Sequence, residues 1–286
     1  MSRSLVACAI DAGTTTIIRA KSSGPSSIEM TSCRTIGYGL DALGGPKRKK
    51  AASRLSDALT EWADEPLSLC ISPSAIMTLP AWFPAGSTKA QREVLGRIEA
   101  GYFLSNVDEW IWHTMPLAPE PDQPADLEQQ MMMFYAAEPV SSFAEEMGRR
   151  CRLGMHGLHI EPVVRLTAGT SEPMAVLELE EKYAAFFVSR GGRAEYFRYW
   201  PVKNASEREF FAITELGASQ VEKVQVTGLA ADTATMRRIA AGTPRTLEPL
   251  GLPPQVSSTG KTRGCISSTG IVRAASTALM ALSPPG

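Results

Sequence analysis

The chain has 286 residues, of which 44% are hydrophobic and 21% are charged, an ordinary balance for a globular protein long enough to bury a sizeable core. Lys and Arg number 29 and Asp and Glu number 30, so the formal net charge is −1. This balance excludes a protein held on nucleic acid or anionic lipid by bulk charge, although it leaves room for a local basic cluster.

Neither a membrane span nor a secretion signal is evident in the sequence. No stretch approaches the roughly 20 apolar residues that a membrane-spanning helix needs. Asp11 ends the apolar run at 5–10, which is then too short for the core of a signal peptide. We therefore expect a cytoplasmic protein. The cysteines are widely spaced and form no CxxC pair, which predicts reduced, mostly buried thiols in place of a disulfide framework or zinc site (Cys8, Cys33, Cys70, Cys151 and Cys265).

The first 72 residues predict strands and one helix. The runs at 5–10 and 14–20 form a hairpin whose turn is Asp11-Ala12-Gly13. The remaining elements expected here are a strand at 27–33, a basic loop at 44–50, a helix at 51–63 and a short buried strand at 67–72.

The next block, roughly 75–155, predicts a compact α+β module in the order β-α-β-β-α. Its first strand, 75–83, contains two prolines and is expected at a sheet edge. Thr88 and Gln91 fit a capping box at the start of a helix. Apolar residues follow at helical spacing at Ala90, Val94, Ile98 and Tyr102. The later elements are strands at 108–117 and 129–138, a Pro-rich loop at 116–126 and a helix that opens at Pro139.

The last third predicts a strand meander followed by helices. Strands are expected at 175–180, 182–190 and 193–202, with Gly191-Gly192 as a two-residue hairpin loop. The elements after the meander are a helix at 205–217 ended by Gly217, a strand at 222–228, a helix at 230–242, a Pro- and Ser-rich loop at 244–262 and an apolar helix at 269–282.

The order of hairpin, helix, strand and helix near the start recurs near 175–241. This echo, together with AIDAGTTTIIRA at 9–20, resembles the two-lobed actin-like ATPase superfamily, in which each lobe opens with a hairpin whose Asp-x-Gly turn meets nucleotide phosphate. The chain is more closely similar to the PilM family of type IV pilus assembly and to the cytoplasmic domain of the GspL family of type II secretion. The matching segments run in order over nearly the whole chain: LCISPSAIMTLPAWFP, Arg92-Glu93, Ile98-Glu99, MMMFYAAEP, a strand GLHIEP and AVLELEEKYAAFFVSRGGRAEYFR.

The resemblance implies an actin-like, ribonuclease H-like α/β fold with two lobes and an inserted α+β subdomain. The second lobe is reduced, because 199–224 holds one helix where the family usually has a further subdomain that helps enclose the base. The implied parts are the first lobe at 1–74, the inserted subdomain at 75–155, a return of the first lobe at 156–172, the second lobe at 173–265 and a closing helix at 266–286.

The resemblance also implies a nucleotide site, for which ATP and Mg²⁺ are the candidate ligands. Asp11 would hold a metal through water, and the amides of Gly13, Thr14 and Thr15 would cradle phosphate; a tight turn without ligand is the alternative. The second turn reads Glu178-Leu179-Glu180 where the family has Asp-x-Gly, so Glu180 adds bulk and like charge where a bare backbone approaches phosphate. The vestigial site we expect comprises Asp11, Gly13, Thr14, Thr15, Glu178 and Gly228.

The basic residue of the first hairpin falls on Arg19 or Ile18, depending on the strand register. A one-residue shift moves a side chain to the other face of the sheet, so the sequence leaves both open.

By the same resemblance we expect a scaffold, a pseudo-ATPase without catalytic or metal-binding residues. It would serve a type IV pilus or type II secretion-like assembly at the inner face of the inner membrane. Its partners would be the N-terminal cytoplasmic tail of a PilN-like bitopic protein, held in a groove near 75–155, and a secretion or pilus ATPase, but no nucleic acid. The alternative is a working ATPase or nucleotide switch in which Glu178 replaces the usual Asp. A sugar- or acid-kinase relative ranks last, because no substrate domain is evident.

Four other motifs have two interpretations each. The segment Thr259-Gly260-Lys261-Thr262 resembles part of a P-loop, but Gln255 stands where that pattern needs glycine. His156 and His159, with Glu161 near, are either two ligands of a metal site that would need a third ligand, or a structural or exposed pair. The run at 47–50 is a solvated loop or a contact for phosphate or acidic headgroups. The aromatic and methionine-rich strands form a docking surface or part of the core (Trp110, Trp112, Met131, Met132 and Met133).

Overall fold

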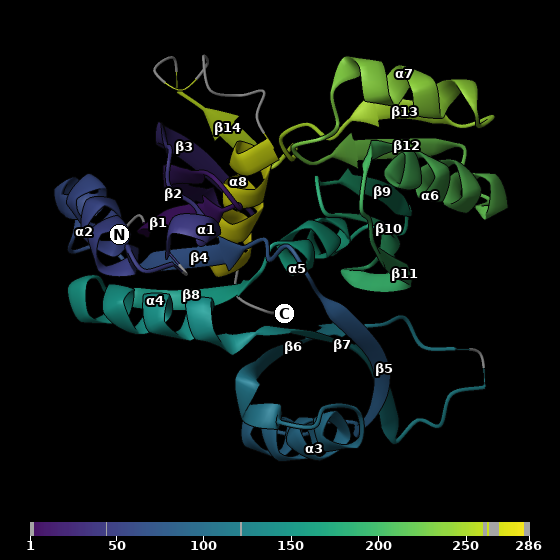
Figure 1. The fold of residues 1–286 in the computed structure, drawn as a ribbon, viewed down its shortest axis with the longest axis horizontal. Coiled ribbons are helices and arrows are strands. Elements are labelled where there is room, and N and C mark those ends of the chain that lie inside the picture. The colour runs from purple at the N-terminus through teal and green to yellow at the C-terminus, as the bar shows by residue number, and fades with distance from the viewer. Residues whose placement is uncertain (1–2, 44, 121, 260–261, 263–268, 283–286) are drawn as a thin grey trace. The chain divides into compact units, whose positions relative to one another are not determined.

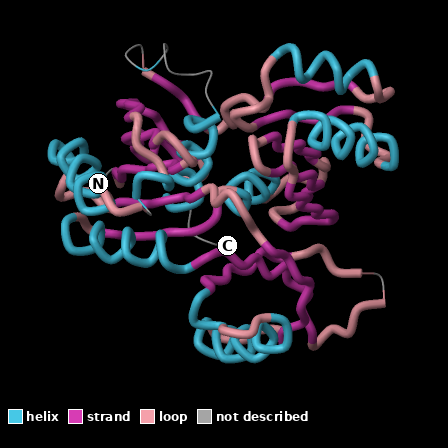
Figure 2. Tube along the Cα trace, in the orientation of Figure 1, coloured by secondary structure: helices cyan, strands magenta, loops and turns pink. Residues whose placement is uncertain are grey.

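A computed structural model describes residues 3–43, 45–120, 122–259, 262 and 269–282 (Figures 1 and 2). The chain divides into two compact units. The first unit comprises 1–73, 137–166 and 251–286, and the second comprises 74–136 and 167–250. Each unit is an α/β structure built around its own sheet or sheets.

The first unit contains a six-stranded sheet in the order β14-β3-β2-β1-β4-β8. Strands β1 to β3 form an antiparallel meander, and β4 lies parallel to β1. β1 is buried except at its first residue, because helices cover both faces of the sheet. The strands are β1 (Ser4–Ile10), β2 (Thr15–Gly24), β3 (Ser27–Ile36), β4 (Leu67–Ile71), β8 (Leu153–Leu158) and β14 (Val256–Ser258).

Helix α8 (Thr269–Leu282) packs on β1, β2 and β4 through small and branched side chains such as Ala275 and Ala278. A second layer contains α1, α2 and α4, which pack on one another. The other helices of this unit are α1 (Leu40–Leu43), α2 (Arg48–Leu59), η1 (Thr60–Trp62), α4 (Ala137–Arg150), α5 (Ile160–Val164) and η3 (Arg165–Thr167, whose last residue belongs to the second unit).

The second unit contains a five-stranded sheet in the order β11-β10-β9-β12-β13. Gly191 and Gly192 turn β10 into β11 with φ of 57° and 76°, which confirms the predicted hairpin loop. Helices α6 (Ala205–Ala218) and α7 (Thr233–Ala241) bury Phe211, Leu216 and Ile239 against the sheet. The strands are β9 (Met174–Leu179), β10 (Tyr183–Arg190), β11 (Arg193–Pro201), β12 (Lys223–Thr227) and β13 (Thr246–Pro249).

The same unit holds a three-stranded antiparallel sheet in the order β5-β7-β6, with β5 at an edge as its prolines predict. A bridge between Leu117 and Ala194 joins this sheet to β11, and the Ala118 amide donates to the Ala194 carbonyl at 2.7 Å. The elements are β5 (Met77–Pro84), α3 (Lys89–Phe103), η2 (Val107–Glu109), β6 (Trp110–Pro116) and β7 (Leu127–Ala136).

Helix α3 places its apolar stripe in solvent. The capping box of Thr88 and Gln91 is confirmed. The buried face, however, is made by Gly96 and Ala100, while Val94, Ile98 and Tyr102 are 61%, 51% and 76% exposed. Gly96 lies so close to the ring of Trp112 that a Cβ would be 2.4 Å from it. The small residues let the helix approach the sheet and leave the larger side chains outside.

Four predicted elements differ from the structure. Residues 160–162 were expected in a strand but begin α5, because Pro162 has no amide to donate to a ladder and is tolerated in the first turn of a helix. Helix α6 continues through Gly217 and ends where Ser219 adopts an extended backbone, so no left-handed glycine is needed. The loop at 244–262 contains β13 and β14, which are too short to show a period. The basic run was expected in a loop at 44–50, but α2 begins at Arg48 and includes the rest of the run.

The cysteines behave as reduced thiols where the structure describes them. Cys8 and Cys70 are buried and Cys33 and Cys151 are partly buried, and none of these four forms a disulfide; Cys265 lies outside the described residues. Burial raises the pKa of the Cys8 thiol well above its usual range, which keeps it neutral. Among the helices of the described part of the chain, none has the length and hydrophobicity needed to cross a bilayer.

We predict opposite effects of two alanine substitutions in α3. Gly101→Ala should raise the free energy of unfolding by about 0.5–1 kcal/mol, because the new methyl meets nothing nearer than 4.0 Å and the helix loses a flexible residue. Gly96→Ala should lower it by about 1–3 kcal/mol, because the methyl overlaps the Trp112 ring. Urea unfolding of both variants measures the difference. Equal stabilisation by the two would contradict this packing of α3.

Candidate functional site

The first candidate turn joins β1 to β2 in the first unit. The Asp11 amide donates to the Thr14 carbonyl at 2.9 Å, which closes the tight turn predicted from the sequence. The Thr15 hydroxyl donates to the Tyr38 carbonyl at 2.6 Å and is buried. Gly13 is exposed, so the turn presents its tip to solvent while both ends are fixed.

The start of α1 packs against the carbonyl side of this turn. The amides of Leu40 and Asp41 donate to the carbonyls of Asp11 and Ala12 at 2.9 and 3.0 Å. A Cβ on Gly39 would lie 2.1 Å from the Asp11 carbonyl oxygen, so only glycine allows this approach. The sequence analysis did not identify Gly39 as part of the turn.

The Asp11 carboxylate forms an ion pair with Arg273 of α8. The Arg273 Nη1 donates to Asp11 Oδ1, and each side chain is only 2% exposed. Gly270, one turn earlier in α8, lies against Thr16, so that a Cβ there would be 2.3 Å from the Thr16 hydroxyl. A metal ion held by Asp11 would therefore have to compete with a buried guanidinium at the same carboxylate.

Sequence reasoning missed Arg273, although a signal for it exists. Arg273 is the one charged residue of α8, and the helix is otherwise apolar or small. A charged residue in such a helix is buried only when it has a partner, so a buried acid elsewhere in the chain was to be expected.

The amides at the tip of the turn remain available. Within the described residues, neither the Gly13 nor the Thr14 amide donates a hydrogen bond to another protein atom. Two adjacent free amides can meet an anion, and phosphate binding at this turn stays a prediction.

Arg19 and Ile18 are separated by the observed register. Ile18 pairs with Ala7 and lies buried under α8. Arg19 pairs with Val6 and donates through Nε to Glu65 at 2.7 Å. The basic side chain is engaged in this ion pair, beside the middle of β1 and away from the turn.

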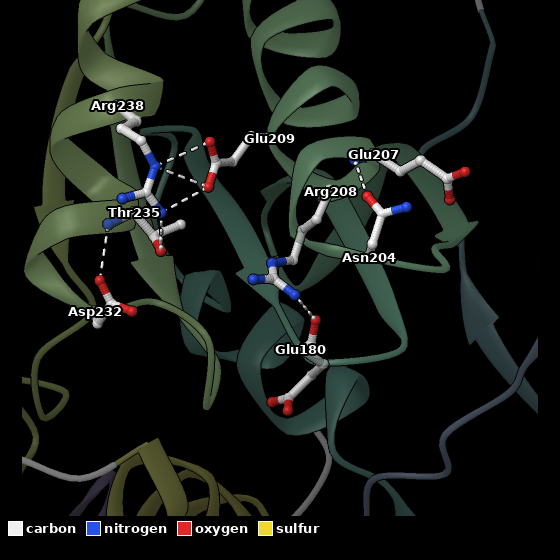
Figure 3. A network of polar contacts seen from close by, with 8 residues as sticks. All are labelled: Glu180, Asn204, Glu207, Arg208, Glu209, Asp232, Thr235 and Arg238. Atoms are coloured by element: carbon white, nitrogen blue, oxygen red, sulfur yellow. Dashed lines mark hydrogen bonds and ion pairs between the residues drawn. The ribbon is translucent and has the colours of Figure 1, made fainter.

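The second candidate turn follows β9 in the second unit. Glu178 is buried and accepts a hydrogen bond from the Tyr183 hydroxyl at 2.7 Å. The Glu180 carboxylate accepts from the Leu229 amide at 3.2 Å. The Glu180 carbonyl accepts from Arg208 at 3.1 Å (Figure 3). Glu180 stands where the resembled family has glycine, and its carboxylate binds the Leu229 amide.

Gly228 holds the end of β12 against the end of β9. Its φ is 110°, and a Cβ would lie 2.1 Å from the Leu179 carbonyl oxygen. That oxygen accepts from the Ala230 amide at 3.0 Å. Glu178 lies on β9, and Gly228 directly follows the neighbouring strand β12. Glu178 pairs with Thr227, so these two residues, predicted from distant segments, lie at the same end of the two strands.

Helices α6 and α7 begin beside this turn (Figure 3). Asn204 caps α6 by accepting from the Glu207 amide at 2.9 Å, and Asp232 caps α7 by accepting from the Thr235 amide at 2.8 Å. The hydrogen bond from Thr235 lowers the pKa of Asp232. Arg238 joins the two helices through a bidentate pair with Glu209. Around Glu180 itself, Arg208 of α6 donates through Nη1 to the Glu180 carbonyl, while its buried Nε finds no partner among the described residues.

The other motifs do not form a site in the described residues. His159 is buried and fixed on the Ile71 carbonyl through both its amide and its Nδ1, at 3.1 and 3.0 Å. The described residues hold no cluster of ligands that could bind a metal. Gly260 and Lys261 of the P-loop-like segment lie outside the described residues. The methionine strand belongs to the core, with all three methionines buried and both tryptophans half-buried beside it (Met131, Met132, Met133, Trp110 and Trp112).

Comparisons with known proteins agree with this architecture. No protein-family model and no curated protein matches the sequence. Among solved structures, the PilM–PilN type IV pilus biogenesis complex is similar with a TM-score of 0.70 and 16% identity, over 98% of this chain and 99% of that one.

Two further structures share the fold. The cytoplasmic domain of EpsL, an inner-membrane component of the type II secretion system of Vibrio cholerae, gives a TM-score of 0.50 at 11% identity over 88% of this chain and 92% of that one. An actin-like ATPase-fold protein of Bacteroides thetaiotaomicron gives 0.51 at 6% identity over 86% and 90%. These likenesses confirm the fold predicted from the sequence: the chain has the actin-like ATPase fold and resembles PilM and the cytoplasmic domain of the GspL-like protein EpsL.

Proposed function

We propose that the chain is a scaffold of a type IV pilus or type II secretion-like assembly that does not hydrolyse ATP. The buried pair of Asp11 and Arg273 carries this proposal. The superfamily uses this carboxylate to hold a metal, whereas here it forms an ion pair within the fold. The Glu180 carboxylate adds to it, because it occupies the Leu229 amide at the second turn. An acidic side chain of each candidate turn is thus engaged within its own unit, Asp11 at the first and Glu180 at the second.

The proposed partner is the N-terminal cytoplasmic tail of a PilN-like bitopic protein at the inner face of the inner membrane. One similar solved structure is a PilM–PilN complex, and 98% of this chain is covered by the match to one chain of it. A secretion or pilus ATPase is the second partner we propose. Cytoplasmic placement is part of the same proposal, since the scaffold has to reach the tail on that side of the membrane.

The surface of the α3 region supports a docking role for an apolar tail segment. A groove of about 640 Å³ runs beside the start of α3 and is lined by Pro84, Ala90, Val94 and Leu95 among others. The described residues of α3 and β5 also include exposed large apolar side chains, of which Val94 lines the groove. They are Met77, Trp82, Val94, Ile98, Tyr102 and Phe103. Such a concentration of exposed apolar side chains marks an interaction surface.

A nucleotide switch is the second candidate, and one observation favours it. The free amides of Gly13 and Thr14 could still receive a phosphate group. A nucleotide bound there would lack the metal ligand that the family provides, because the Asp11 carboxylate is paired with Arg273. Only a movement of Arg273 away from Asp11 would free that carboxylate.

We predict that Mg-ATP does not stabilise the protein. A ligand present at about 100 times its dissociation constant would add about 2.7 kcal/mol to the free energy of unfolding, which a thermal-shift measurement detects readily. The scaffold proposal expects a flat response at millimolar Mg-ATP. Mg²⁺ alone and ATP with a chelator are the controls. A clear shift that needs both Mg²⁺ and ATP would establish the nucleotide switch and reject the proposal.

We predict that charged substitutions on α3 weaken binding of the partner tail. The probe is a synthetic peptide of the N-terminal cytoplasmic tail of the proposed PilN-like partner, titrated by fluorescence anisotropy. Val94→Glu and Ile98→Glu should each weaken binding at least tenfold, about 1.4 kcal/mol, because each places a charge on the apolar stripe. Both side chains are exposed, so the fold should be retained.

The matched control is Phe210→Glu on α6, a side chain that is 72% exposed. It should leave the affinity within about twofold. Equal weakening by all three variants would show that α3 is not the docking surface. An absence of binding by the unmodified protein would reject the partner itself.

A further inference from the structure

The first turn of α2 carries four consecutive basic residues, Lys47 to Lys50, and all four are exposed. Lys47 is the N-cap but makes no capping hydrogen bond through its side chain, and the first turn contains no acidic residue. Positive charge at this end opposes the helix dipole, which favours Asp or Glu there. The stability of α2 therefore does not explain why these residues are basic.

The two acids that share a groove with this basic turn, Glu145 and Glu146, pair with arginines of their own helix. A groove of about 130 Å³ joins α2 and α4. Glu146 pairs with Arg150 at 2.6 Å, and Glu145 lies 3.8 Å from Arg149, so the arginines of α4 balance its own acids. In the ion pairs formed between described residues, none of the four basic residues takes part. The charged lining of the groove consists of Arg48, Lys49, Glu145, Glu146 and Arg149.

The rest of α2 holds the basic turn in place. Ala51, Ala52, Leu55 and Leu59 are buried, so the helix is anchored immediately after the fourth basic residue. Four charges at adjacent positions point in different directions around one turn, and they form a compact cluster at the helix end in place of a stripe along one side.

We propose that this basic turn, Lys47–Lys50, binds the phosphate groups of an anionic lipid surface. Each basic residue near an anionic leaflet increases binding by about fivefold, so four adjacent residues give a contact that is measurable but reversible. The whole chain has a net charge of −1, so the attraction comes from this turn and not from the protein as a whole.

Nucleic acid fits the turn less well than a lipid surface. Binding along a nucleic-acid backbone uses a stripe of about six to ten phosphate contacts or aromatic side chains on which bases stack. The basic run covers one helical turn, and residues 44–53 contain no aromatic side chain. The inference stands without the proposed function, because it uses only the charge and position of α2.

The test is flotation of the purified full chain with vesicles. Phosphatidylcholine vesicles with added phosphatidylglycerol are compared with pure phosphatidylcholine at low salt. The triple variant Lys47→Gln/Lys49→Gln/Lys50→Gln removes three charges from the turn. The control Lys182→Gln/Lys203→Gln/Arg237→Gln removes three exposed charges from the second unit. Circular dichroism and thermal unfolding verify that both variants fold.

We expect the wild type and the control to float only with the anionic vesicles, and the triple variant to lose at least tenfold in partitioning. Raising the ionic strength from about 0.1 M to about 1 M should abolish binding, because the Debye length falls from about 10 Å to about 3 Å. Equal behaviour of the two variants would overturn the proposal.

Two competitors distinguish the other anions. Tighter binding to a duplex oligonucleotide than to the vesicles would assign the turn to nucleic acid and overturn the lipid proposal. Displacement by inorganic phosphate beyond that produced by chloride at equal ionic strength would assign it to free phosphate, with the same consequence.

Discussion

The Asp11 carboxylate and the Arg273 guanidinium meet where neither is more than 2% exposed, and the first unit is organised around this contact. Taking either charge out of water alone is expensive, so each residue requires the other. The pair fixes the end of β1 to α8, while the start of α1 is held on the same turn by the amides of Leu40 and Asp41. Gly39 and Gly270 allow the two close approaches that this arrangement needs. The hairpin, the short helix and the closing helix are therefore parts of one packed unit.

The same contact changes what an actin-like turn can do. A carboxylate that holds a metal ion must be free to do so, whereas a carboxylate that neutralises a buried arginine stabilises the fold. At the other turn Glu180 plays a comparable part, because its carboxylate receives the Leu229 amide while Arg208 binds its carbonyl. Side chains at both turns thus serve packing within their own units. In the scaffold function that we propose, such a fold presents surfaces to partners, and the exposed apolar stripe of α3 is the surface we assign to this role.

Much of the fold could be predicted from the sequence, because its local signals are strong. The Asp-Ala-Gly turn, the Gly191-Gly192 loop and the capping box of Thr88 and Gln91 each depend on a few adjacent residues. The pairing of Asp11 with Arg273 could not be found in this way, since 262 positions separate the partners and only the isolated charge in α8 hinted at it. The α3 stripe was equally out of reach. Helical spacing identifies an apolar face, but the neighbouring ring of Trp112 decides that Gly96 is the residue packed inside.

The central claim is that Asp11 and Arg273 stabilise the first unit as a pair, and a double-mutant cycle tests it most directly. The free energy of unfolding would be measured by denaturant titration for Asp11→Asn, Arg273→Met and the double variant. Each single substitution should cost about 3–5 kcal/mol, because it leaves the other charge buried and unpaired. The double variant should cost less than the sum by at least about 2 kcal/mol. Costs that add to within about 0.5 kcal/mol would mean that the two residues act independently and would contradict the account.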